Sequence, residues 1–475
     1  MKKMTSFDVI VIGSGSAGFS AVQAAHAQGV SVCLIEKDRL GGECPNKACI
    51  PSKALLRAAK FYRTLNRARD FGVELGGKSF QFKKIMQYRQ TAVDTITGGG
   101  DRGDRYIDIL NQLDIHRRFG EAFFLDPHTI EINGEHLYAK TFVIATGTVD
   151  FIPPIVGLED VRFWTWREAL EAKRQPKSLA IIGGGPVGCE VATFYASFDT
   201  RVLLLQTSPM VLEREDREIS LLAQDVLEQM GIEVVVNAHI EKIVHARGGV
   251  AGLSVIAGDS VSQMHAVEQI VVTTGKRPNI ESLQLALTGV QLDKKGYVKT
   301  KKDQRTNRVH IFAAGDVDGG LQFTHTAHQE GWVAGSNAAL FVKSKKAKAF
   351  QTDHRVIPRV TFLALEVASV GMTQQEIQKR YGKVLVGRYS IASLGRAVTD
   401  SATQGMIKLV AHPQTRKLLG AHIIGERAGE MIHEAALAVY LNTTMDKLAK
   451  MIHAFPTFSE GIKAAASAAR IESSL

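Results

Sequence analysis

Hydrophobic and polar positions at the start of the chain predict alternating strands and helices. Residues 7–12 (FDVIVI) form a short apolar run rich in β-branched side chains, which is typical of a strand. Residues 16–26 (SAGFSAVQAAH) then follow an alanine-rich helical pattern, and residues 30–36 (VSVCLIE) return to a strand pattern. This order predicts a strand–helix–strand unit and therefore an α/β fold.

A glycine-rich turn joins the first predicted strand to the helix. Gly13 permits the tight turn, Gly15 lets a pyrophosphate approach the backbone, and Gly18 lets helix and strand pack closely. The second strand ends in Glu36, where an acid accepts hydrogen bonds from an adenosine ribose. Glycine turns alone are common, but the complete order of strand, turn, helix, strand and acid predicts a dinucleotide-binding site.

The same pattern recurs at residues 177–206 (KSLAIIGGGPVGCEVATFYASFDTRVLLLQ). The glycines of this second turn are Gly183, Gly185 and Gly188. Two such units predict two bound dinucleotides. The second unit ends in Gln206, where the first ends in Glu36, so the usual carboxylate for the ribose of NAD is missing. No arginine follows directly to bind a 2′-phosphate, and the choice between NADH and NADPH therefore stays open.

The composition fits an ordinary globular protein. The 475 residues exceed what one hydrophobic core usually organises, which predicts about two to four domains. Hydrophobic residues make up 45% of the chain and charged residues 22%, so neither a disordered nor a fibrous class is indicated.

The formal net charge of +10 changes this picture little. Lys and Arg are spread along the chain and are concentrated only in short runs at 299–308 and 343–348, so we expect no nucleic-acid partner. The excess of positive charge favours binding of anionic dinucleotides instead.

The N-terminal residues predict neither export nor membrane insertion. The apolar stretch within MKKMTSFDVIVIGSG is too short for a signal peptide or a membrane span, and it lacks a small-residue cleavage site. The four cysteines are too few and too scattered for a disulfide framework. We therefore expect a cytoplasmic protein without a membrane partner. Cys33 and Cys189 fall in apolar patterns, which predicts buried, small hydrophobic residues.

Cys44 and Cys49 lie five residues apart in GGECPNKACIPSK, at residues 41–53. A structural disulfide would close a loop too short to restrict the unfolded chain much, and two thiolates supply only half of a tetrahedral zinc site. Pro51 suits a first helical position, so Cys49 is expected just ahead of a helix N-terminus with Lys53 in its first turn. Both features favour a thiolate, and redox cycling suits the pair best. We expect no metal site.

These motifs carry a resemblance to a known family. The chain resembles the flavin-dependent pyridine nucleotide-disulfide oxidoreductases, close to dihydrolipoamide dehydrogenase and mercuric reductase, over nearly its whole length. The matching segments, in order, are GGECPNKACIPSK (41–53), VIATGTVDFIPP (143–154), VVTTGKRPN (271–279), FAAGDV (312–317), FTHTAHQEGWVAGSNA (323–338) and VIPRVTFLALEVASVG (356–371).

The resemblance implies an α/β fold with two Rossmann-like dinucleotide-binding domains and a C-terminal α+β dimerisation domain. The implied segments are an FAD-binding part at 1–150, an NAD(P)-binding domain at 151–275, a return to the FAD-binding part at 276–346, and the interface domain at 347–475. It also implies a homodimer with FAD and either NADH or NADPH as cofactors.

The resemblance assigns roles to individual residues. Cys44 is implied as the outer, substrate-facing sulfur and Cys49 as the sulfur against the flavin, so that electrons pass from NAD(P)H through the flavin to this disulfide and on to an acceptor. Lys53 and Glu190 are implied as a pair beside the flavin ring. The residues implied to bind FAD are Gly13, Gly15, Gly18, Glu36, Gly42, Thr146, Gly147 and Asp316. Those implied to bind NAD(P) are Gly183, Gly185, Gly188, Gln206 and Gly275.

The chain departs from the family near its C-terminus, in MIHAFPTFSEGIKAAA. Many members carry an H-P-T-x-x-E element here, whose histidine, held by the glutamate, acts across the dimer interface as acid and base. Phe455 replaces that histidine, while Glu460 is retained. His453 lies two residues upstream and either substitutes for the missing imidazole or is merely packed. We favour the packed interpretation, because a two-residue shift in a loop seldom restores the geometry of catalysis.

Four functions follow as hypotheses. The first is an FAD- and NAD(P)H-dependent oxidoreductase that passes electrons through the cysteine pair to a small-molecule acceptor, namely a quinone, a metal ion or a disulfide. The second is a dihydrolipoamide dehydrogenase that uses His453 or water as its base. The third is a metal reductase like mercuric reductase, although the C-terminal ARIESSL lacks the vicinal cysteines of that group. The fourth is a non-catalytic, flavin-binding dimer.

Overall fold

The computed structural model describes residues 5–77, 79–245, 250–258, 260–344 and 347–473, and the chain divides into two units. Unit 1 comprises residues 1–54, 87–151 and 275–354, and unit 2 comprises residues 55–86, 152–274 and 355–475. Helix α3 (Cys49–Leu65) and helix α4 (Phe82–Thr97) each begin in one unit and end in the other. The four segment boundaries expected from the resemblance stay a prediction.

Unit 1 is built on a seven-stranded sheet with the order β3-β2-β1-β6-β5-β4, and β17 pairs with β6. Its strands are β1 (Thr5–Ile12), β2 (Val32–Glu36), β3 (His116–Phe119), β4 (Ala122–Asp126), β5 (Thr129–Ile132), β6 (Glu135–Ile144) and β17 (Ile311–Ala313). Strands β1, β2, β3, β6 and β17 run parallel, whereas β4, β5 and β6 form antiparallel hairpins. The predicted strands at 7–12 and 30–36 are therefore adjacent, with Ile12 opposite Ile35.

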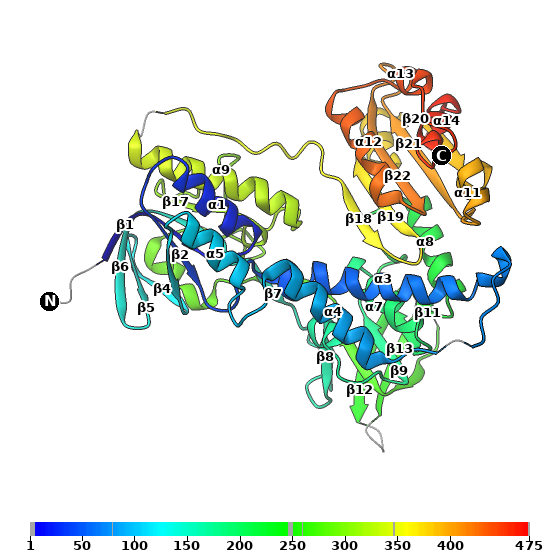
Figure 1. Ribbon diagram of the computed structural model, residues 1–475, viewed down its shortest axis with the longest axis horizontal. Coiled ribbons are helices and arrows are strands. Elements are labelled where there is room, and N and C mark those ends of the chain that lie inside the picture. Colours follow the sequence, from blue (N-terminus) through cyan, green and yellow to red (C-terminus); the bar gives the residue numbers. More distant parts are fainter. Residues whose placement is uncertain (1–4, 78, 246–249, 259, 345–346, 474–475) are drawn as a thin grey trace. The chain divides into compact units, whose positions relative to one another are not determined.

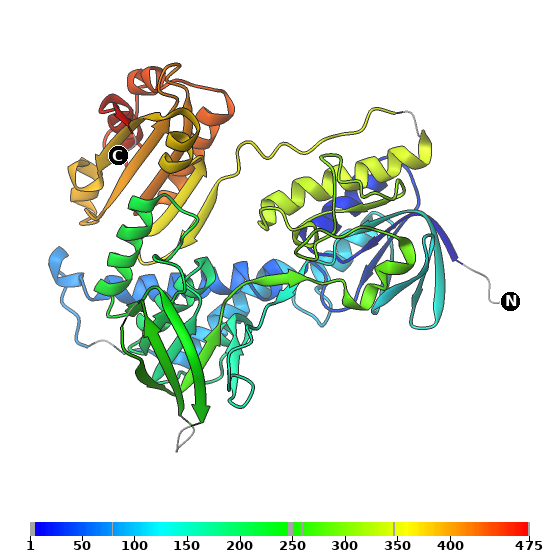
Figure 2. The ribbon, with the colours of Figure 1, turned by 180° about the vertical axis from the view of Figure 1, so that it is seen from behind.

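Two helices of unit 1 pack closely along each other, α1 (Ser16–His26) and α9 (Thr324–Lys343) (Figures 1 and 2). A Cβ atom on Gly331 would lie 2.0 Å from the carbonyl oxygen of Ala17, and one on Gly335 would lie 2.1 Å from that of Ala21. Glycine at these two positions is what lets the helix backbones approach. The start of α9 is thereby held beside the glycine turn that begins α1.

Short elements complete unit 1. They are α2 (Glu43–Asn46), α5 (Asp104–Gln112), the antiparallel pair β7 (Thr148–Asp150) and β16 (Lys276–Pro278), and the 3₁₀ helices η2 (Glu281–Leu283), η3 (Leu285–Thr288) and η4 (Asp316–Asp318). Cys33 on β2 is fully buried, as expected, and burial raises the pKa of its thiol to about 12.

Unit 2 contains a second parallel sheet, with the order β11-β10-β9-β15-β8. Its strands are β8 (Phe163–Thr165), β9 (Ser178–Ile182), β10 (Arg201–Leu205), β11 (Glu233–Val235) and β15 (Gln269–Val272). Its helices are α6 (Trp166–Leu170), α7 (Pro186–Ala196) and α8 (Arg217–Gln229). An antiparallel sheet of β12 (Ala238–His245), β13 (Ala251–Ala257) and β14 (Gln263–Val267) is inserted before β15. Cys189 on α7 is fully buried, as expected.

The C-terminal part of unit 2 is a six-stranded antiparallel sheet with the order β18-β19-β22-β21-β20-β23. Its strands are β18 (Arg359–Phe362), β19 (Glu366–Gly371), β20 (Lys383–Ser390), β21 (Gly405–Ala411), β22 (Leu418–Gly425) and β23 (Arg470–Ser473). Its helices are α10 (Gln374–Tyr381), α11 (Gly395–Thr399), α12 (Ala428–Tyr440), α13 (Met445–Lys450) and α14 (Glu460–Ser467), and η5 (Ile391–Ser393) is a 3₁₀ turn. The 3₁₀ turn η1 (Ala68–Phe71) belongs to the first segment of unit 2 and follows α3.

A buried ionic cluster lies inside unit 2. Lys408 on β21 and Asp216, the N-cap of α8, are both fully buried, with Lys408 Nζ 2.6 Å from Asp216 Oδ1. Lys408 Nζ is also 2.8 Å from Glu218, which in turn pairs with Arg388 on β20. Buried charges persist only when they are paired, so this cluster ties α8 to the antiparallel sheet.

The described part of the chain holds no helix that combines the length and the apolar character needed to cross a membrane. Nor do the described residues include a group of three or more His, Cys, Asp and Glu placed to hold a metal ion. The architecture is that of two dinucleotide-binding sheets and an antiparallel C-terminal sheet, as the resemblance implied.

Candidate active site

The first glycine turn forms an open cradle at the N-terminus of α1. Gly13 has φ +99°, and a Cβ atom there would lie 2.3 Å from the carbonyl oxygen of Ala145, so another residue would be both strained and blocked. A Cβ atom on Gly18 would lie 1.8 Å from the carbonyl oxygen of Gly13, which explains the close helix–strand packing. At Gly15, in contrast, no described atom lies within 4 Å of the added position. A pyrophosphate therefore has room at this helix end.

Glu36 stabilises the cradle from the end of β2. Its Oε2 accepts hydrogen bonds from the backbone N–H (2.9 Å) and the hydroxyl (2.6 Å) of Ser14, and its Oε1 accepts from the N–H of Asp38 (2.8 Å). The two bonds from Ser14 use both acceptor sites of Oε2, whereas Oε1 keeps a second acceptor site. Glu36 is thus placed to hold the turn while also accepting from a ribose hydroxyl.

Three further residues expected to bind FAD lie near each other in unit 1. Asp316 Oδ2 accepts a hydrogen bond from the Thr148 hydroxyl at 3.2 Å. Burial raises the pKa of Asp316 above its ordinary value, and the charge of Lys276 opposes this rise only in part. Gly147 has φ +66° with open space around it. The buried Thr146 hydroxyl has no hydrogen-bond partner in the described part of the chain. An unsatisfied hydroxyl beside an open glycine and a weakly bonded carboxylate fits a polar ligand such as FAD.

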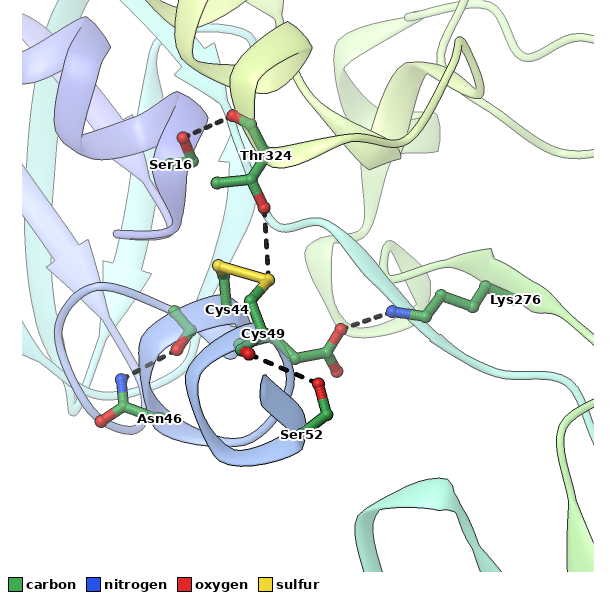
Figure 3. Close-up of a disulfide and its surroundings, with 9 residues drawn as sticks. Ser16, Cys44, Asn46, Cys49, Ser52, Lys276 and Thr324 are labelled. Carbon is green, nitrogen blue, oxygen red and sulfur yellow. Dashed lines mark hydrogen bonds and ion pairs between the residues drawn. A yellow bond between two sulfur atoms is a disulfide. The ribbon is translucent and has the colours of Figure 1, made fainter. Parts of the chain in front are cut away.

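The redox pair is bonded, with Cys44 on α2 joined to Cys49 on α3 by a disulfide (Figure 3). The two Cα atoms are 4.7 Å apart, within the usual range for a disulfide. Asn46 holds the connecting loop by donating to the carbonyl oxygens of Leu40 (2.9 Å) and Gly42 (2.8 Å). A Cβ atom on Gly42 would lie 2.5 Å from the Cα of Gly15, so the disulfide loop contacts the FAD cradle.

Helix α3 begins at Cys49, earlier than the start at Pro51 that the sequence predicted. The N–H of Ser52 donates to the carbonyl oxygen of Ala48 (2.9 Å), so the first helical turn already includes Pro51. Proline is tolerated there because the first N–H groups of a helix lack intrahelical partners. Cys49 therefore lies at the helix N-terminus, where the dipole favours a thiolate.

Two contacts beside the disulfide were not predicted from the sequence. The hydroxyl of Thr324, the first residue of α9, lies 3.5 Å from Cys49 Sγ, and Ser16 donates to the Thr324 carbonyl oxygen at 2.8 Å. Glu43, directly before Cys44, forms an ion pair with Lys276 on β16 (Figure 3). All of these residues except Ser16 fall inside the motifs that carry the resemblance, which was the available signal. Pairing between distant motifs is not visible in one sequence.

The second glycine turn repeats the first in unit 2. A Cβ atom on Gly183 would lie 2.7 Å from the carbonyl oxygen of Thr273, one on Gly188 would lie 1.9 Å from that of Gly183, and Gly185 is open. Gln206 Oε1 accepts from the N–H of Gly184 at 2.7 Å, as Glu36 does from Ser14. The Gln206 side chain thus holds the second glycine turn as the Glu36 carboxylate holds the first, but it carries no negative charge.

Lys53 and Glu190 lie in different units, on α3 and α7. Glu190 is buried, and its Oε1 accepts from the N–H of Phe362 at 3.1 Å. Gly275 opens the last segment of unit 1 with φ +129°. The pairing of Lys53 with Glu190, and the role of Gly275, stay predictions.

The C-terminal element presents an apolar side chain, Phe455, where the resemblance implies an imidazole in many members of the family. Phe455 is 80% exposed. Glu460 Oε2 accepts from the N–H of Thr457 at 2.9 Å, so this acid stabilises the turn. His453 Nε2 lies 2.9 Å from Glu434 Oε1, and its side chain is 6% exposed. Its Nδ1 is buried without a partner among the described residues. Such enclosure supports the interpretation of His453 as a packed residue.

A cavity of about 320 Å³ lies beside this element in unit 2. Its lining residues are Arg396, Arg427, Glu430, Met431, Pro456, Thr457, Phe458 and Ser459. The Arg427 guanidinium lies 5.8 Å from the centre of the Phe458 ring. The element that carries Phe455 therefore borders a cavity whose lining includes two arginines.

Comparison with known proteins extends these observations. The sequence matches the family described as pyridine nucleotide-disulphide oxidoreductase at residues 7–331, and the dimerisation domain of that family at residues 357–466. The chain is 33% identical to the mercuric reductase of Staphylococcus aureus over 460 residues, covering 97% of this chain and 82% of that protein. It is 32% identical to a dihydrolipoyl dehydrogenase of Bacillus subtilis (strain 168) over 478 residues, covering 98% of each.

Among solved structures, the HOCl-induced flavoprotein disulfide reductase RclA from Escherichia coli matches with a TM-score of 0.83 and 25% identity, covering 97% of this chain and 99% of that one. The fold class, the family and the cofactors expected from the sequence are confirmed. The dimerisation domain also supports a homodimer. The chain belongs to the pyridine nucleotide-disulphide oxidoreductases, and it is an enzyme of this FAD-binding, NAD(P)H-dependent family.

Proposed function

We propose that the protein passes two electrons from NADH or NADPH to the Cys44–Cys49 disulfide and on to a small-molecule acceptor that requires little proton transfer. The observation that carries this proposal is the bonded cysteine pair at a helix N-terminus. The exposed, apolar Phe455 supports it, because the resemblance implies an acid-base histidine at this position. Bound FAD supplies the two-electron transfer between the nicotinamide and the sulfur pair.

The residues around the disulfide are suited to hold its reduced form. Two-electron reduction breaks the S–S bond and leaves two sulfur atoms that each take up a proton or remain thiolate. The N-terminus of α3 and the Thr324 hydroxyl both favour the thiolate of Cys49. Cys44 is then the sulfur that attacks or reduces the acceptor. Re-forming the disulfide passes both electrons on, either to one two-electron acceptor or to two one-electron acceptors.

The missing imidazole argues against dihydrolipoamide as the main substrate. A dithiol must lose protons as it is oxidised, and loss of a positioned acid-base group typically costs about 10²- to 10⁴-fold in rate. Phe455 cannot transfer a proton, and the enclosure of His453 keeps it from replacing the base. Quinones, metal ions and activated disulfides accept electrons with less demand on a base.

A metal ion is the acceptor with the most specific support. Relatives at 33% and 32% identity are named mercuric reductases, and solved structures of the E. coli flavoprotein include a Cu(II) complex with a TM-score of 0.84 and 25% identity to this chain. A reduced cysteine pair offers the soft thiolate ligands that such ions prefer. The complete second glycine turn argues against a non-catalytic dimer, because a protein that only bound flavin would not need a nicotinamide site.

An acceptor screen with both nicotinamides tests the proposal. The purified holoenzyme is assayed with Cu(II), Hg(II), a quinone, an aromatic disulfide and lipoamide, in parallel with Cys44→Ser and with Cys189→Ala as a control outside the pair. We expect turnover of the preferred acceptor to fall about a hundredfold or more in Cys44→Ser and to stay unchanged in Cys189→Ala. Unchanged turnover of every acceptor in Cys44→Ser, or lipoamide as the best acceptor, would refute it.

A further inference from the structure

A group of titratable side chains in unit 1 lies behind the turn that carries Asp316. Glu330 on α9 is 3% exposed at its side chain, and its Oε2 accepts a hydrogen bond from the backbone N–H of Gly315 at 2.9 Å. Its Oε1 lies 3.2 Å from Nε2 of His354. One buried carboxylate therefore joins helix α9, the residue directly before Asp316, and the end of unit 1.

Asp318 completes this group from the other end of η4. Its Oδ2 accepts from the Thr300 hydroxyl at 3.2 Å, and its Oδ1 accepts from the N–H of Gly320 at 3.2 Å. A Cβ atom on Gly320 would lie 3.4 Å from Asp318 Oδ1 and 3.7 Å from Glu330 Oε1. The two carboxylates thus converge on the same small space, where like charges repel.

The charges in this space do not balance without a proton. Two carboxylates face one imidazole, so at most one of them is neutralised by His354 in its charged form. Burial and the charge of Glu330 raise the pKa of Asp318 to about 7, and the hydrogen bond to Glu330 raises the pKa of His354. Asp353 also acts on His354, and Glu330 acts on Asp316 together with Lys276 and Glu43. The side chain of His354 is 33% exposed, which gives protons a route to the group.

The geometry links this group to the flavin site. Gly315 has φ +78° and Gly319 has φ +83°, so η4 is bounded by two left-handed glycines. Backbone hydrogen bonds, such as that from the N–H of Val298 to the carbonyl oxygen of Val317 (3.0 Å), hold η4 together with the Glu330 contact to Gly315. Asp316 within η4 is expected to bind the ribityl and pyrophosphate region of FAD. Asp318 lies two residues from Asp316, so a change of charge at Asp318 acts on the residue that is expected to bind FAD through less than one helical turn of backbone.

We propose that Glu330 is a positioning residue for the FAD-binding turn, and that one proton taken up beside it, at Asp318 and His354, couples FAD binding to pH. The inference extends beyond the electron acceptor, because it requires only that FAD binds. FAD brings negatively charged phosphates toward the group, and this negative charge favours the protonated form. The enzyme with FAD bound therefore retains the proton to a higher pH than the enzyme without FAD. FAD binding is then strongest below neutrality and weakens as the pH rises through the neutral range.

The rate of FAD release from the holoenzyme tests the coupling. Release is followed as the rise of flavin fluorescence after high dilution, between about pH 6 and pH 8.5. We expect release to be about tenfold faster at the upper end in the wild-type enzyme, which corresponds to about 1.4 kcal/mol. Asp318→Asn mimics the protonated acid and is expected to abolish the dependence. His328→Gln, at an exposed position on helix α9, is the control and should retain the pH dependence.

A second pair of variants tests the positioning role at about pH 6, where this proton is present. Glu330→Gln keeps an oxygen that accepts from the N–H of Gly315, whereas Glu330→Ala removes it. We expect release to be about tenfold faster in Glu330→Ala and within about threefold of the wild type in Glu330→Gln, since one buried hydrogen bond contributes about 1 to 1.5 kcal/mol.

Two results would overturn the proposal. One is a pH dependence that is absent in the wild type or unchanged in Asp318→Asn. The other is equal FAD release in Glu330→Gln and Glu330→Ala. If Glu330→Ala does not fold, the comparisons of Asp318→Asn and Glu330→Gln with the wild type decide whether the proposal holds. None of these outcomes depends on the acceptor, so they are separate from a failure of the proposed electron relay.

Discussion

The contact between Thr324 and Cys49 is the most specific interaction that the structure adds to the redox pair. The Thr324 hydroxyl lies 3.5 Å from Cys49 Sγ, close enough to donate a weak hydrogen bond to sulfur once the disulfide is open. A donor to the charged form of an acid favours that form. Thr324 is therefore expected to lower the pKa of the Cys49 thiol in the reduced enzyme.

Replacing Thr324 with Val removes this donor while keeping the side-chain shape. We expect the pKa of the Cys49 thiol to rise, with a loss of about 1 kcal/mol of thiolate stabilisation. The pH dependence of thiolate absorbance in the reduced enzyme measures the change. Ser52→Ala is the matched control, because that hydroxyl bonds the Cys49 carbonyl oxygen at 3.4 Å and not the sulfur. A thiolate titration that is the same in Thr324→Val and the wild type would contradict this role.

Phe455 offers a test by gain of function. Glu460 is retained and the surrounding turn is intact, with Thr457 hydrogen-bonded to both Glu460 and Ala454. Phe455→His would restore the element found in related thiol oxidoreductases. We expect oxidation of dihydrolipoamide to rise by about 10-fold or more, within the range that general acid-base catalysis supplies. Steady-state rates against pH measure it, with Phe455→Gln as a control that cannot titrate. No gain in Phe455→His would show that the missing base is not what limits thiol turnover.

Among elements, the buried link between α8 and β21 carries the largest expected stability effect. The partners of Lys408 at the start of α8 are almost two hundred residues away in the sequence. Lys408→Met leaves Asp216 and Glu218 without their buried cation, which we expect to destabilise the protein by about 3 to 5 kcal/mol. Chemical unfolding measures the change. Arg416→Met, which breaks an exposed pair with Asp446, should cost about 0 to 1 kcal/mol. Similar losses in both variants would contradict the burial argument.

Glu218 in the same cluster gives a dependence of stability on pH. The hydrogen bond from Arg388, followed by that from Lys408, lowers the pKa of Glu218 to about 2. A carboxyl whose pKa is lower in the folded state stabilises the protein above its ordinary pKa of 4.5, and this contribution is lost as the pH falls toward 2. The gap in melting temperature between the wild type and Glu218→Gln should be widest near neutrality and narrow in acid. A gap that stays constant down to about pH 3 would show that the charge of Glu218 is not responsible.

The elements also show where prediction from sequence succeeds and where it ends. The strand–turn–helix units at Gly13 and Gly183 were predictable, because local hydrophobic spacing and glycine placement fix them. The start of α3 was predicted later than it is, because proline at a first turn is permitted at more than one position. The need for glycine at Gly331 and Gly335 could not be predicted from the local sequence. It comes from close contact with the backbone of α1, which is about three hundred residues away in the sequence.

At the scale of the whole molecule, the ordered motifs predicted the family, the cofactors and the redox pair. They did not predict the Thr324 contact, the Glu43–Lys276 ion pair or the Glu330 group, because each joins side chains from distant motifs. The acceptor was not predictable either, since acceptor contacts come from loops without a pattern.

The central claim is that the sulfur pair and the flavin form one electron-storing unit. Anaerobic titration of the holoenzyme with dithionite or NADH, followed by flavin absorbance and thiol counting, measures this directly. Storage of two electrons on the disulfide and two on the flavin predicts complete reduction at about four electrons per FAD, with two new thiols per chain. Complete reduction at about two electrons per FAD, without new thiols, would contradict the claim.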